Sequence, residues 1–546
     1  MRCNSLPLHC FLSIAFYALL VCGSCGSRVR ADKKIFRYNE SSGIASLDPA
    51  FAKNQSIMWA VHQLYSTLVE VDQRLEIRPL LAKSWSFSAD KRTLTFELRT
   101  DVYFHDDAAF PDAKGRKVTA HDVQYSFNRI LDKNTASPGS WIFNNRVDSI
   151  EPFIAKDDST FQVRLLRPFH PILGILSMQY CSIVPREAVE KYGPEFRRHP
   201  VGSGPFRFVA WEEGQALVLK KHDHYFEQDS SGYALPYLDG IKVNFYDSKA
   251  TEFLEFSQRR LDFINDIDPS FKDEVLTKTG NLKQAWQGKV LLHKHSYLNI
   301  EYFGILYDTT NVLLKNSPLK QHAIRQAINY AINRKKMMLY LRNSIGTAAE
   351  SGFVPQGLPS FDAVEVKGFY HDPAKARDLL AKAGFGPNNP VPEITLLTIP
   401  VYSSLASYVA NELKQAGINV QVETIQKSLL LEQTSKGQAL FFRGSWIADY
   451  PDAENYLSVF YSKNPAPPNY TRYRNTAFDK LYEMALEEEN DSLRYALYQR
   501  MDKLIVQDAP VVPLWYDMVI HLVHTNVQDF WPNGLNMLEL RRVRKE

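Results

Sequence analysis

The sequence predicts an α/β fold in which strands and helices alternate. The clearest observation is a strand, a helix and a second strand in succession, over residues 394–399, 405–416 and 418–422. Such a unit implies two parallel strands joined by a right-handed crossover. Earlier in the chain, residues 93–99 alternate with a period of two, as a half-buried strand does. Both observations favour a chain that combines helices and strands.

The first residues have the pattern of an export signal. Arg2 precedes an apolar stretch over residues 11–21, which is shorter than the roughly 20 residues of a membrane-spanning helix. Small residues then precede Cys25, an arrangement that resembles a bacterial lipobox, in which the cysteine is lipidated. Cys22 stands where the usual leucine is found, so ordinary signal-peptidase cleavage is the alternative. We expect a signal peptide over residues 1–24, with lipid on Cys25 as the only membrane anchor.

Cysteine content and charge exclude several classes of protein. Four of the five cysteines lie in the leader, so no disulfide framework or cysteine metal site is expected, and Cys181 should be a buried thiol. With 64 basic and 61 acidic residues the charge is nearly balanced, and the one basic cluster is the short tail 541–545. Nucleic-acid binding therefore has little electrostatic support. The chain is long enough for two or three domains.

Capping residues predict where several helices begin. Thr119, with Asp122 three positions later, resembles a capping box at the start of a helix. Further along, Ser317 precedes a proline in a pattern that predicts a helix start, as Asp372 does. Gly417 is expected to end the helix over residues 405–416.

No catalytic or metal-binding motif stands out. His105 lies beside two aspartates, but no other His or Cys has ligand spacing, so a turn is expected there. Trp85 and Trp211 are expected to be packing residues. The sequence has no Gly-rich phosphate loop, no Gly-x-Ser-x-Gly elbow and no His-Glu-x-x-His motif. We expect no enzyme, no metal and no cofactor, although a dispersed hydrolase triad would leave no local motif.

The segment after Phe442 is the strongest candidate for a binding site. A short apolar run, residues 439–442, is expected to break into a loop that carries Trp446 and Asp449. A carboxylate beside an indole suits a primary ammonium group, because the acid gives charge-assisted hydrogen bonds and the ring shields them from water. The alternative is that Asp449 caps a helix. Ligands of open α/β sheets gather near strand carboxyl ends, which favours a site here.

Ordered segments spread over residues 35–525 carry a resemblance to a known family. They are residues 47–49, 65–69, 80–90, 101–106, 119–127, 202–206 and 325–334. Together they resemble the family 5 extracellular solute-binding proteins, the dipeptide- and oligopeptide-binding receptors of bacterial ABC importers. The resemblance implies a monomeric receptor in the periplasm or on the outer face of the cell membrane. Its partners would be a peptide and the permease and ATPase of the importer.

The resemblance also implies a bilobed periplasmic-binding-protein-like fold of type II, with mixed sheets, a hinge and an extra inserted subdomain. One lobe would comprise residues 32–70, 200–295 and 515–546, with the inserted subdomain over residues 71–199. The second lobe would comprise residues 296–514. A peptide buried between the lobes needs partners for its backbone N–H and C=O groups.

Residue by residue, the resemblance assigns a site in the second lobe. In the family, a Trp-x-x-Asp loop supplies the aspartate that pairs with the α-ammonium group of the peptide, and residues 446–449 match this loop. Asp449 is therefore assigned to the ammonium and Trp446 to the wall of the pocket. Strand-like backbone contacts with the peptide fall to Gly444, Ser445 and Ile447.

Several ligands remain open at this point. Dipeptide receptors of the family carry an arginine in a second-lobe loop that clamps the ligand carboxylate, but residues 399–404 contain none. An oligopeptide is therefore favoured over a strict dipeptide. The alternatives are a non-peptide ligand on the same fold, such as a nickel chelate, haem or an oligosaccharide, and an exported hydrolase.

Overall fold

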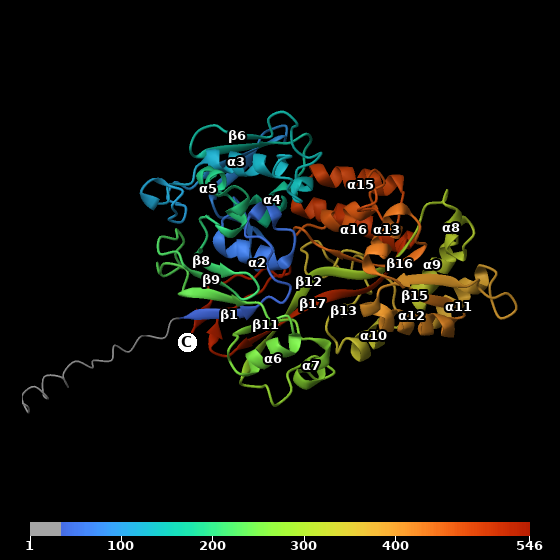
Figure 1. The fold of residues 1–546 in the computed structure, drawn as a ribbon. Helices are drawn as coiled ribbons and strands as arrows, with labels where there is room; N and C mark the ends of the chain where they lie inside the picture. Colours follow the sequence, from blue (N-terminus) through green and yellow to red (C-terminus); the bar gives the residue numbers. More distant parts are fainter. Residues whose placement is uncertain (1–33) are drawn as a thin grey trace, which may run out of the picture.

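The computed structural model describes residues 34–546, so Cys25 and the rest of the leader lie outside it (Figure 1). Two four-stranded sheets and one seven-stranded sheet organise the chain. The first sheet has the order β1-β10-β9-β8. Its strands are β1 (Ile35–Asn39), β8 (Phe206–Glu212), β9 (Ala216–Lys221) and β10 (Gly240–Asn244). Because β1 pairs in parallel with β10, two segments about 200 residues apart form one layer.

The second sheet lies at the top of Figure 1, next to α3 (Ala120–Leu131). Its strands are β4 (Ala82–Phe87), β5 (Thr93–Leu98), β6 (Phe153–Ala155) and β7 (Thr160–Arg164). The predicted strand at residues 93–99 is thus confirmed as β5. The capping box is confirmed too, because the Thr119 side chain accepts from the third helical N–H and Asp122 accepts from the Thr119 N–H.

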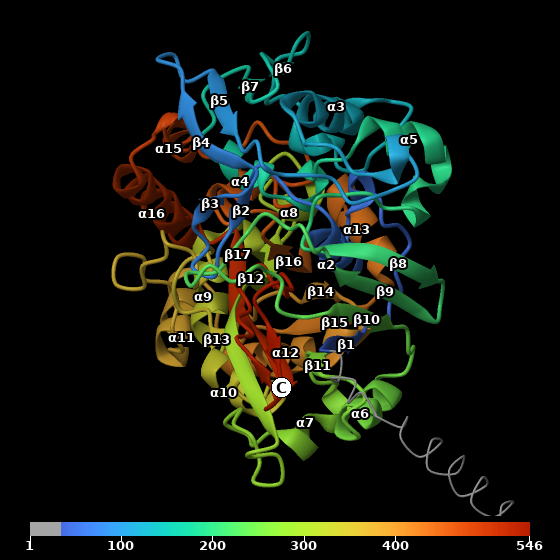
Figure 2. The same ribbon diagram turned by 90° about the vertical axis from the view of Figure 1, so that its left-hand side faces the viewer.

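The seven-stranded sheet has the order β11-β17-β12-β16-β14-β15, with β13 beside β17. Its strands are β11 (Phe263–Asn265), β12 (Val290–Ile305), β13 (Thr347–Ala348), β14 (Ile394–Thr398), β15 (Val420–Thr424), β16 (Phe441–Ile447) and β17 (Val511–His524). The long strands β12 and β17 run through its centre (Figure 2). Their register shifts between Ser296 and Ile300, so the two halves of the sheet meet at an irregular point.

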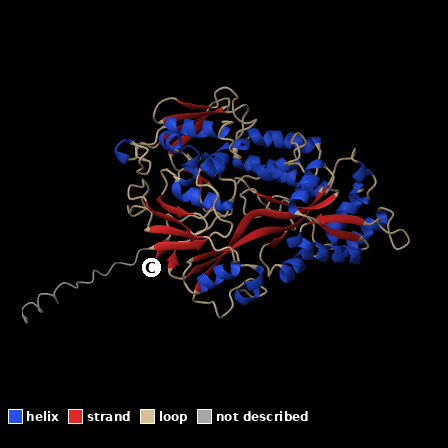
Figure 3. Ribbon diagram, viewed as in Figure 1, coloured by secondary structure: helices blue, strands red, loops and turns tan. Residues whose placement is uncertain are grey.

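The predicted strand–helix–strand unit is confirmed within this sheet. β14 and β15 pair in parallel, and α12 (Ser403–Ala416) connects them. Gly417 ends the helix with φ +96°, in the left-handed region where glycine lacks the penalty of a Cβ. Figure 3 shows helices on both sides of this part of the sheet. They are α8 (Val312–Lys315), α9 (His322–Ala331), α10 (Arg334–Leu341), α11 (Pro373–Lys382), α12 and α13 (Lys427–Lys436).

The remaining elements are short, apart from two helices near the carboxyl end. The long pair is α15 (Thr476–Glu487) and α16 (Asp491–Asp508). The others are α2 (Gln55–Leu64), α4 (Ile172–Leu176), α5 (Arg186–Tyr192), α6 (Lys249–Ser257), α7 (Pro269–Val275), α14 (Glu454–Leu457), the hairpin of β2 (Val69–Val71) and β3 (Ile77–Pro79), and the pair β18 (Val527–Gln528) and β19 (Arg544–Lys545). Within residues 34–546, no helix is both long and apolar enough to cross a membrane.

Two expectations about local structure were wrong. The helix expected at Ser317 begins at His322, because Gln321 has an extended backbone (φ −80°, ψ 125°) that separates it from a 3-10 turn over Pro318–Lys320. The apolar run expected to end at Phe442 continues as β16 to Ile447. Pairing with β12 along its whole length extends the strand beyond its apolar residues.

The main hydrophobic core joins segments that are distant in the sequence. It contains apolar side chains from residues 36–263 together with others from 448–505. At one contact, a Cβ added to Gly174 would lie 3.2 Å from the Cβ of Tyr450. A second core lies between the seven-stranded sheet and the helices α9 to α12. Cys181 is a buried free thiol, as predicted. The lobe boundaries expected from the sequence stay a prediction.

Candidate functional site

A cavity of about 710 Å³ lies where several of these segments meet. Its walls come from the start of α2, the β2–β3 hairpin, the segment 177–180, the end of β16 and the C-terminal segment 531–542. Aromatic side chains line it at Trp141, Tyr180, Tyr297 and Trp531. Cavities of roughly 300–1,000 Å³ with apolar walls and a few polar groups are typical of small-ligand sites. Asp449 and Ile447 line this cavity.

Asp449 follows β16 directly and faces the cavity. Asp449 is exposed and lines the cavity. Desolvation by the surrounding protein raises the pKa of its carboxyl, while the Asn455 hydrogen bond and Arg146 act in the opposite direction. The Asn455 amide donates to Asp449 Oδ2 over 3.2 Å. The carboxyl group is not a helix cap, because Asp452 accepts from the first N–H of α14 instead. It is therefore available to a ligand.

Asn455 is a site residue that sequence reasoning missed. Its Oδ1 accepts from the indole N–H of Trp446 over 2.9 Å and from the backbone N–H of Asp449 over 3.3 Å. Asn455 is buried, so it holds both residues in fixed positions. No pattern in the sequence marked it, because its role depends on how the loop folds back on α14.

The residues assigned to the Trp-x-x-Asp loop occupy different surroundings. Trp446 is half-buried against the main core and does not line the cavity. Gly444 packs under Tyr302, since a Cβ there would lie 2.6 Å from the Tyr302 ring. Ser445 is half-buried, and Ile447 is exposed in the cavity. The structure therefore brings Ile447 and Asp449 to the cavity and places Trp446 and Gly444 behind them.

One edge of β16 is available for an extended chain. Along its other edge β12 pairs continuously, from Asn299 opposite Ile447 to Ile305 opposite Phe441. β14 meets β16 at a single pair, Leu397 with Phe442. Among the residues that the structure describes, the stretch after Phe442 thus has no strand partner on this side. Strand edges without a partner can bind extended peptides by strand addition.

A second buried carboxyl group and an arginine lie near Asp449. Glu454 is fully buried, and burial raises the pKa of its carboxyl, which accepts from the hydroxyls of Tyr450 and Tyr482. Arg146 is a cation close enough to lower the pKa of both Glu454 and Asp449. Arg146 forms no ion pair with Asp449, because its guanidinium donates to the backbone carbonyls of Trp141 and Ile142. A ligand cation beside Asp449 would favour the ionised form of its carboxyl.

Tyr180 also lines the cavity, close enough to Asp449 to feel its charge. Burial and, to a smaller extent, the Asp449 charge raise the pKa of Tyr180 to about 12. The phenol thus stays protonated at neutral pH, and it lines the cavity as a polar, uncharged group.

The loop 399–404, which lacks the arginine of dipeptide receptors, packs against an arginine from β16. Arg443 donates to both oxygens of Glu301 over 2.7 and 2.6 Å, and its guanidinium lies 4.0 Å from the centre of the Tyr402 ring. Tyr402 also donates to Glu301 over 3.1 Å. Arg443 is therefore neutralised within the protein, and it does not line the cavity. The position of Arg443 follows from the pairing of β12 with β16, which the sequence did not predict.

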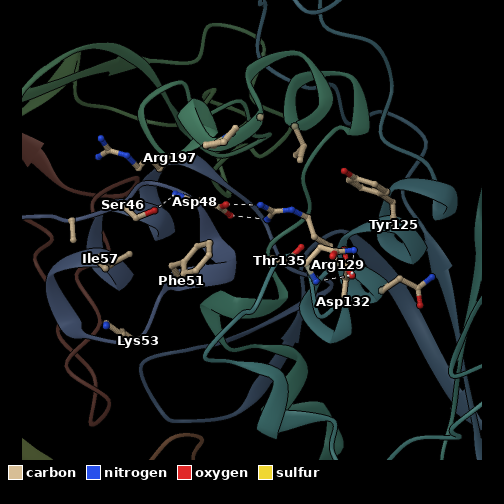
Figure 4. Close-up of a pocket in the computed structure, with 16 residues that line it drawn as sticks. Ser46, Asp48, Phe51, Lys53, Ile57, Tyr125, Arg129, Asp132, Thr135 and Arg197 are labelled. Atoms are coloured by element: carbon tan, nitrogen blue, oxygen red, sulfur yellow. Dashed lines mark hydrogen bonds and ion pairs between the residues drawn. The ribbon is translucent and has the colours of Figure 1, made fainter.

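A second hollow of about 890 Å³ carries none of the predicted site residues (Figure 4). The turn around Asp48, α3 and the segment 189–197 line it. At its floor, Arg129 donates to both oxygens of Asp48 over 2.7 and 2.5 Å. Because these charges satisfy each other, we assign the pair a structural role, and the smaller cavity beside Asp449 is the better candidate site.

His105 is buried, and its ring contacts a backbone carbonyl and another histidine. It contacts the Gly204 carbonyl oxygen over 3.0 Å, and its ring packs edge-on to His222. Burial lowers the pKa of His105 to about 3, so it is neutral. Across residues 34–546, no three His, Cys, Asp or Glu side chains converge to hold a metal ion.

Known proteins resemble this chain over nearly its whole length. Residues 76–468 match the family described as bacterial extracellular solute-binding proteins, family 5. The dipeptide-binding protein DppE of Bacillus subtilis is 24% identical, covering 96% of this chain and 94% of its own length. Heme-binding protein A of Haemophilus influenzae is 28% identical over 83% of this chain and 81% of its own.

A solved structure extends the likeness to the fold. The periplasmic binding protein DppA from Helicobacter pylori, solved with the peptide STSA, is 25% identical. It superposes with a TM-score of 0.73 and covers 94% of this chain and 98% of its own. The mixed α/β fold of this chain is therefore the fold of the periplasmic peptide-binding proteins, as the resemblance implied.

Proposed function

This chain belongs to family 5 of the bacterial extracellular solute-binding proteins, non-catalytic receptors of ABC transport, and from that premise we propose that its ligand is a peptide. The protein would act as a monomer, capture the peptide outside the cytoplasm and deliver it to a membrane permease. We propose an oligopeptide rather than a dipeptide, because the cavity is roomy and the loop 399–404 lacks an arginine.

The observation that carries this proposal is the carboxyl group of Asp449. Asn455 holds it where it lines the cavity, and within residues 34–546 it forms no ion pair with a cation. A peptide α-ammonium provides that cation with several N–H donors. The unpaired edge of β16 beside it supplies backbone partners that do not depend on the peptide sequence. Haem has no ammonium group, so Asp449 favours a peptide over haem.

Mass spectrometry of the ligands released when the purified protein is denatured tests the proposal. We expect a mixture of short peptides with free amino termini, because backbone contacts do not select side chains. Protein carrying Asp449→Asn, purified in parallel, should release much less peptide. Recovery of haem, a metal chelate or an oligosaccharide from the wild type, with no peptide, would overturn the proposal.

We propose that the mature protein begins at a lipidated Cys25. This residue lies outside the described residues, and the support is the short apolar stretch followed by small residues. Labelling of expressing cells with a fatty-acid analogue should mark the wild type but not Cys25→Ser. Equal labelling of the two proteins would contradict the assignment and favour ordinary signal-peptidase cleavage.

A further inference from the structure

The tip of the β2–β3 hairpin is held rigidly at the cavity. Asp72 Oδ1 accepts from the backbone N–H groups of Arg74 and Glu76 over 2.8 and 3.0 Å. Leu75 has φ +65°, which is strained for a leucine, and its buried side chain packs against Gly534. The backbone of Arg74 is therefore fixed from both sides, while Arg74 itself lines the cavity. Figure 2 shows the β2–β3 hairpin that carries it.

Most charged groups that line the cavity are already paired. Arg78 donates to Asp72 over 2.9 Å, and His62 contacts Glu539 over 3.2 Å. Buried Arg541 forms ion pairs with three glutamates, Glu70, Glu227 and Glu539. Arg542 is half-exposed and lies 3.4 Å from Glu227.

Two cations in the cavity wall remain uncommitted. Within residues 34–546, neither Arg74 nor Lys53 has an ion pair or a side-chain hydrogen bond, and both are exposed. Asp449 lines the same cavity, and among the described residues it has no ion pair with a cation. The cavity thus offers one unpaired acid and two unpaired cations, a set that suits a ligand with both an ammonium and a carboxylate.

We infer that Arg74 receives a carboxylate group of the bound peptide. The inference rests on the proposed function and answers which residue neutralises the anionic part of the ligand. An arginine suits this role because its planar guanidinium can donate two parallel hydrogen bonds to a carboxylate. Arg74 is the better candidate than Lys53 because its backbone is fixed, whereas Lys53 also borders the second hollow. The carboxylate belongs either to the peptide C-terminus or to an acidic side chain.

Calorimetry with three matched peptides tests the inference and separates these two sources. The probes are tetra-alanine, tetra-alanine amide, and Ala-Ala-Glu-Ala amide. We expect the wild type to bind at least one carboxylate-bearing probe about tenfold more tightly than tetra-alanine amide, a typical effect of a charge-assisted hydrogen bond. Preference for tetra-alanine identifies the C-terminus, and preference for the glutamate peptide identifies a side chain. Arg74→Gln should abolish the preference and leave binding of tetra-alanine amide nearly unchanged.

Arg78→Gln is the matched control, because Arg78 belongs to the same hairpin but is paired within the protein. Any loss that it causes should be equal for acid and amide peptides. A preference that survives Arg74→Gln, or that disappears with Lys53→Gln instead, would overturn the inference alone. Failure of all three peptides to bind the wild type would overturn the proposed function, and this inference with it.

Discussion

Replacing Asp449 with asparagine is expected to weaken the binding of peptides with a free amino terminus at least about thirtyfold. The substitution preserves the shape and the contact with Asn455 but removes the negative charge. Loss of one partner from a buried charge pair typically costs about 2–5 kcal/mol, because the other charge is left without compensation. Calorimetry on the purified, ligand-free protein measures the effect.

N-acetylated peptides provide the control for this prediction. They carry no ammonium group, so they should bind the wild type weakly and lose little more with Asp449→Asn. The four combinations of protein and peptide form a double-mutant cycle that isolates the charge interaction. Equal losses for free and acetylated peptides would show that Asp449 acts only on the loop structure.

The same charge makes binding depend on pH in a defined direction. Burial raises the pKa of the Asp449 carboxyl, and an ammonium ligand lowers it again by favouring the ionised form. Affinity should therefore be constant above the raised pKa and should fall as the pH drops through it. The fall should begin at a higher pH than it would for an aspartate with an ordinary pKa. In Asp449→Asn this part of the pH dependence should be absent.

Replacing Arg129 with methionine is expected to lower the free energy of unfolding by about 3–5 kcal/mol, the usual cost of leaving a buried charge unpaired. Its partner Asp48 has a side chain only 5% exposed, and Arg129 itself is 13% exposed (Figure 4). Asp48 also accepts from the Ala50 N–H over 3.0 Å, so it cannot turn away without breaking that turn. Urea denaturation of the wild type and the variant measures the difference.

Two further variants show whether the loss of stability comes from breaking the buried pair or from removing any arginine. Arg186→Met removes one partner of the exposed pair Arg186–Glu190 and should change stability little. Adding Asp48→Asn to Arg129→Met should recover part of the lost stability, because the stranded charge is removed. If Arg129→Met were no more destabilising than Arg186→Met, the pair would not support the fold.

The sequence alone determined the features that depend on short-range interactions. The capping box at Thr119, strand β5 and the β14–α12–β15 unit were predicted, because caps and side-chain periodicity act over a few residues. The family was identified in the same way, from local segments whose order is preserved along the chain. The Trp-x-x-Asp segment predicted that Asp449 binds the ligand, and Asp449 lines the cavity.

Only the tertiary structure decided what surrounds those features. Asn455, Arg146 and the open edge of β16 define the site around Asp449, yet none follows a sequence pattern. Arg541, which the sequence placed in a basic tail, is buried among three glutamates. The physical reason is that pairing across strands and burial of charge join residues tens to hundreds of positions apart, and one sequence records the residues but not which of them meet.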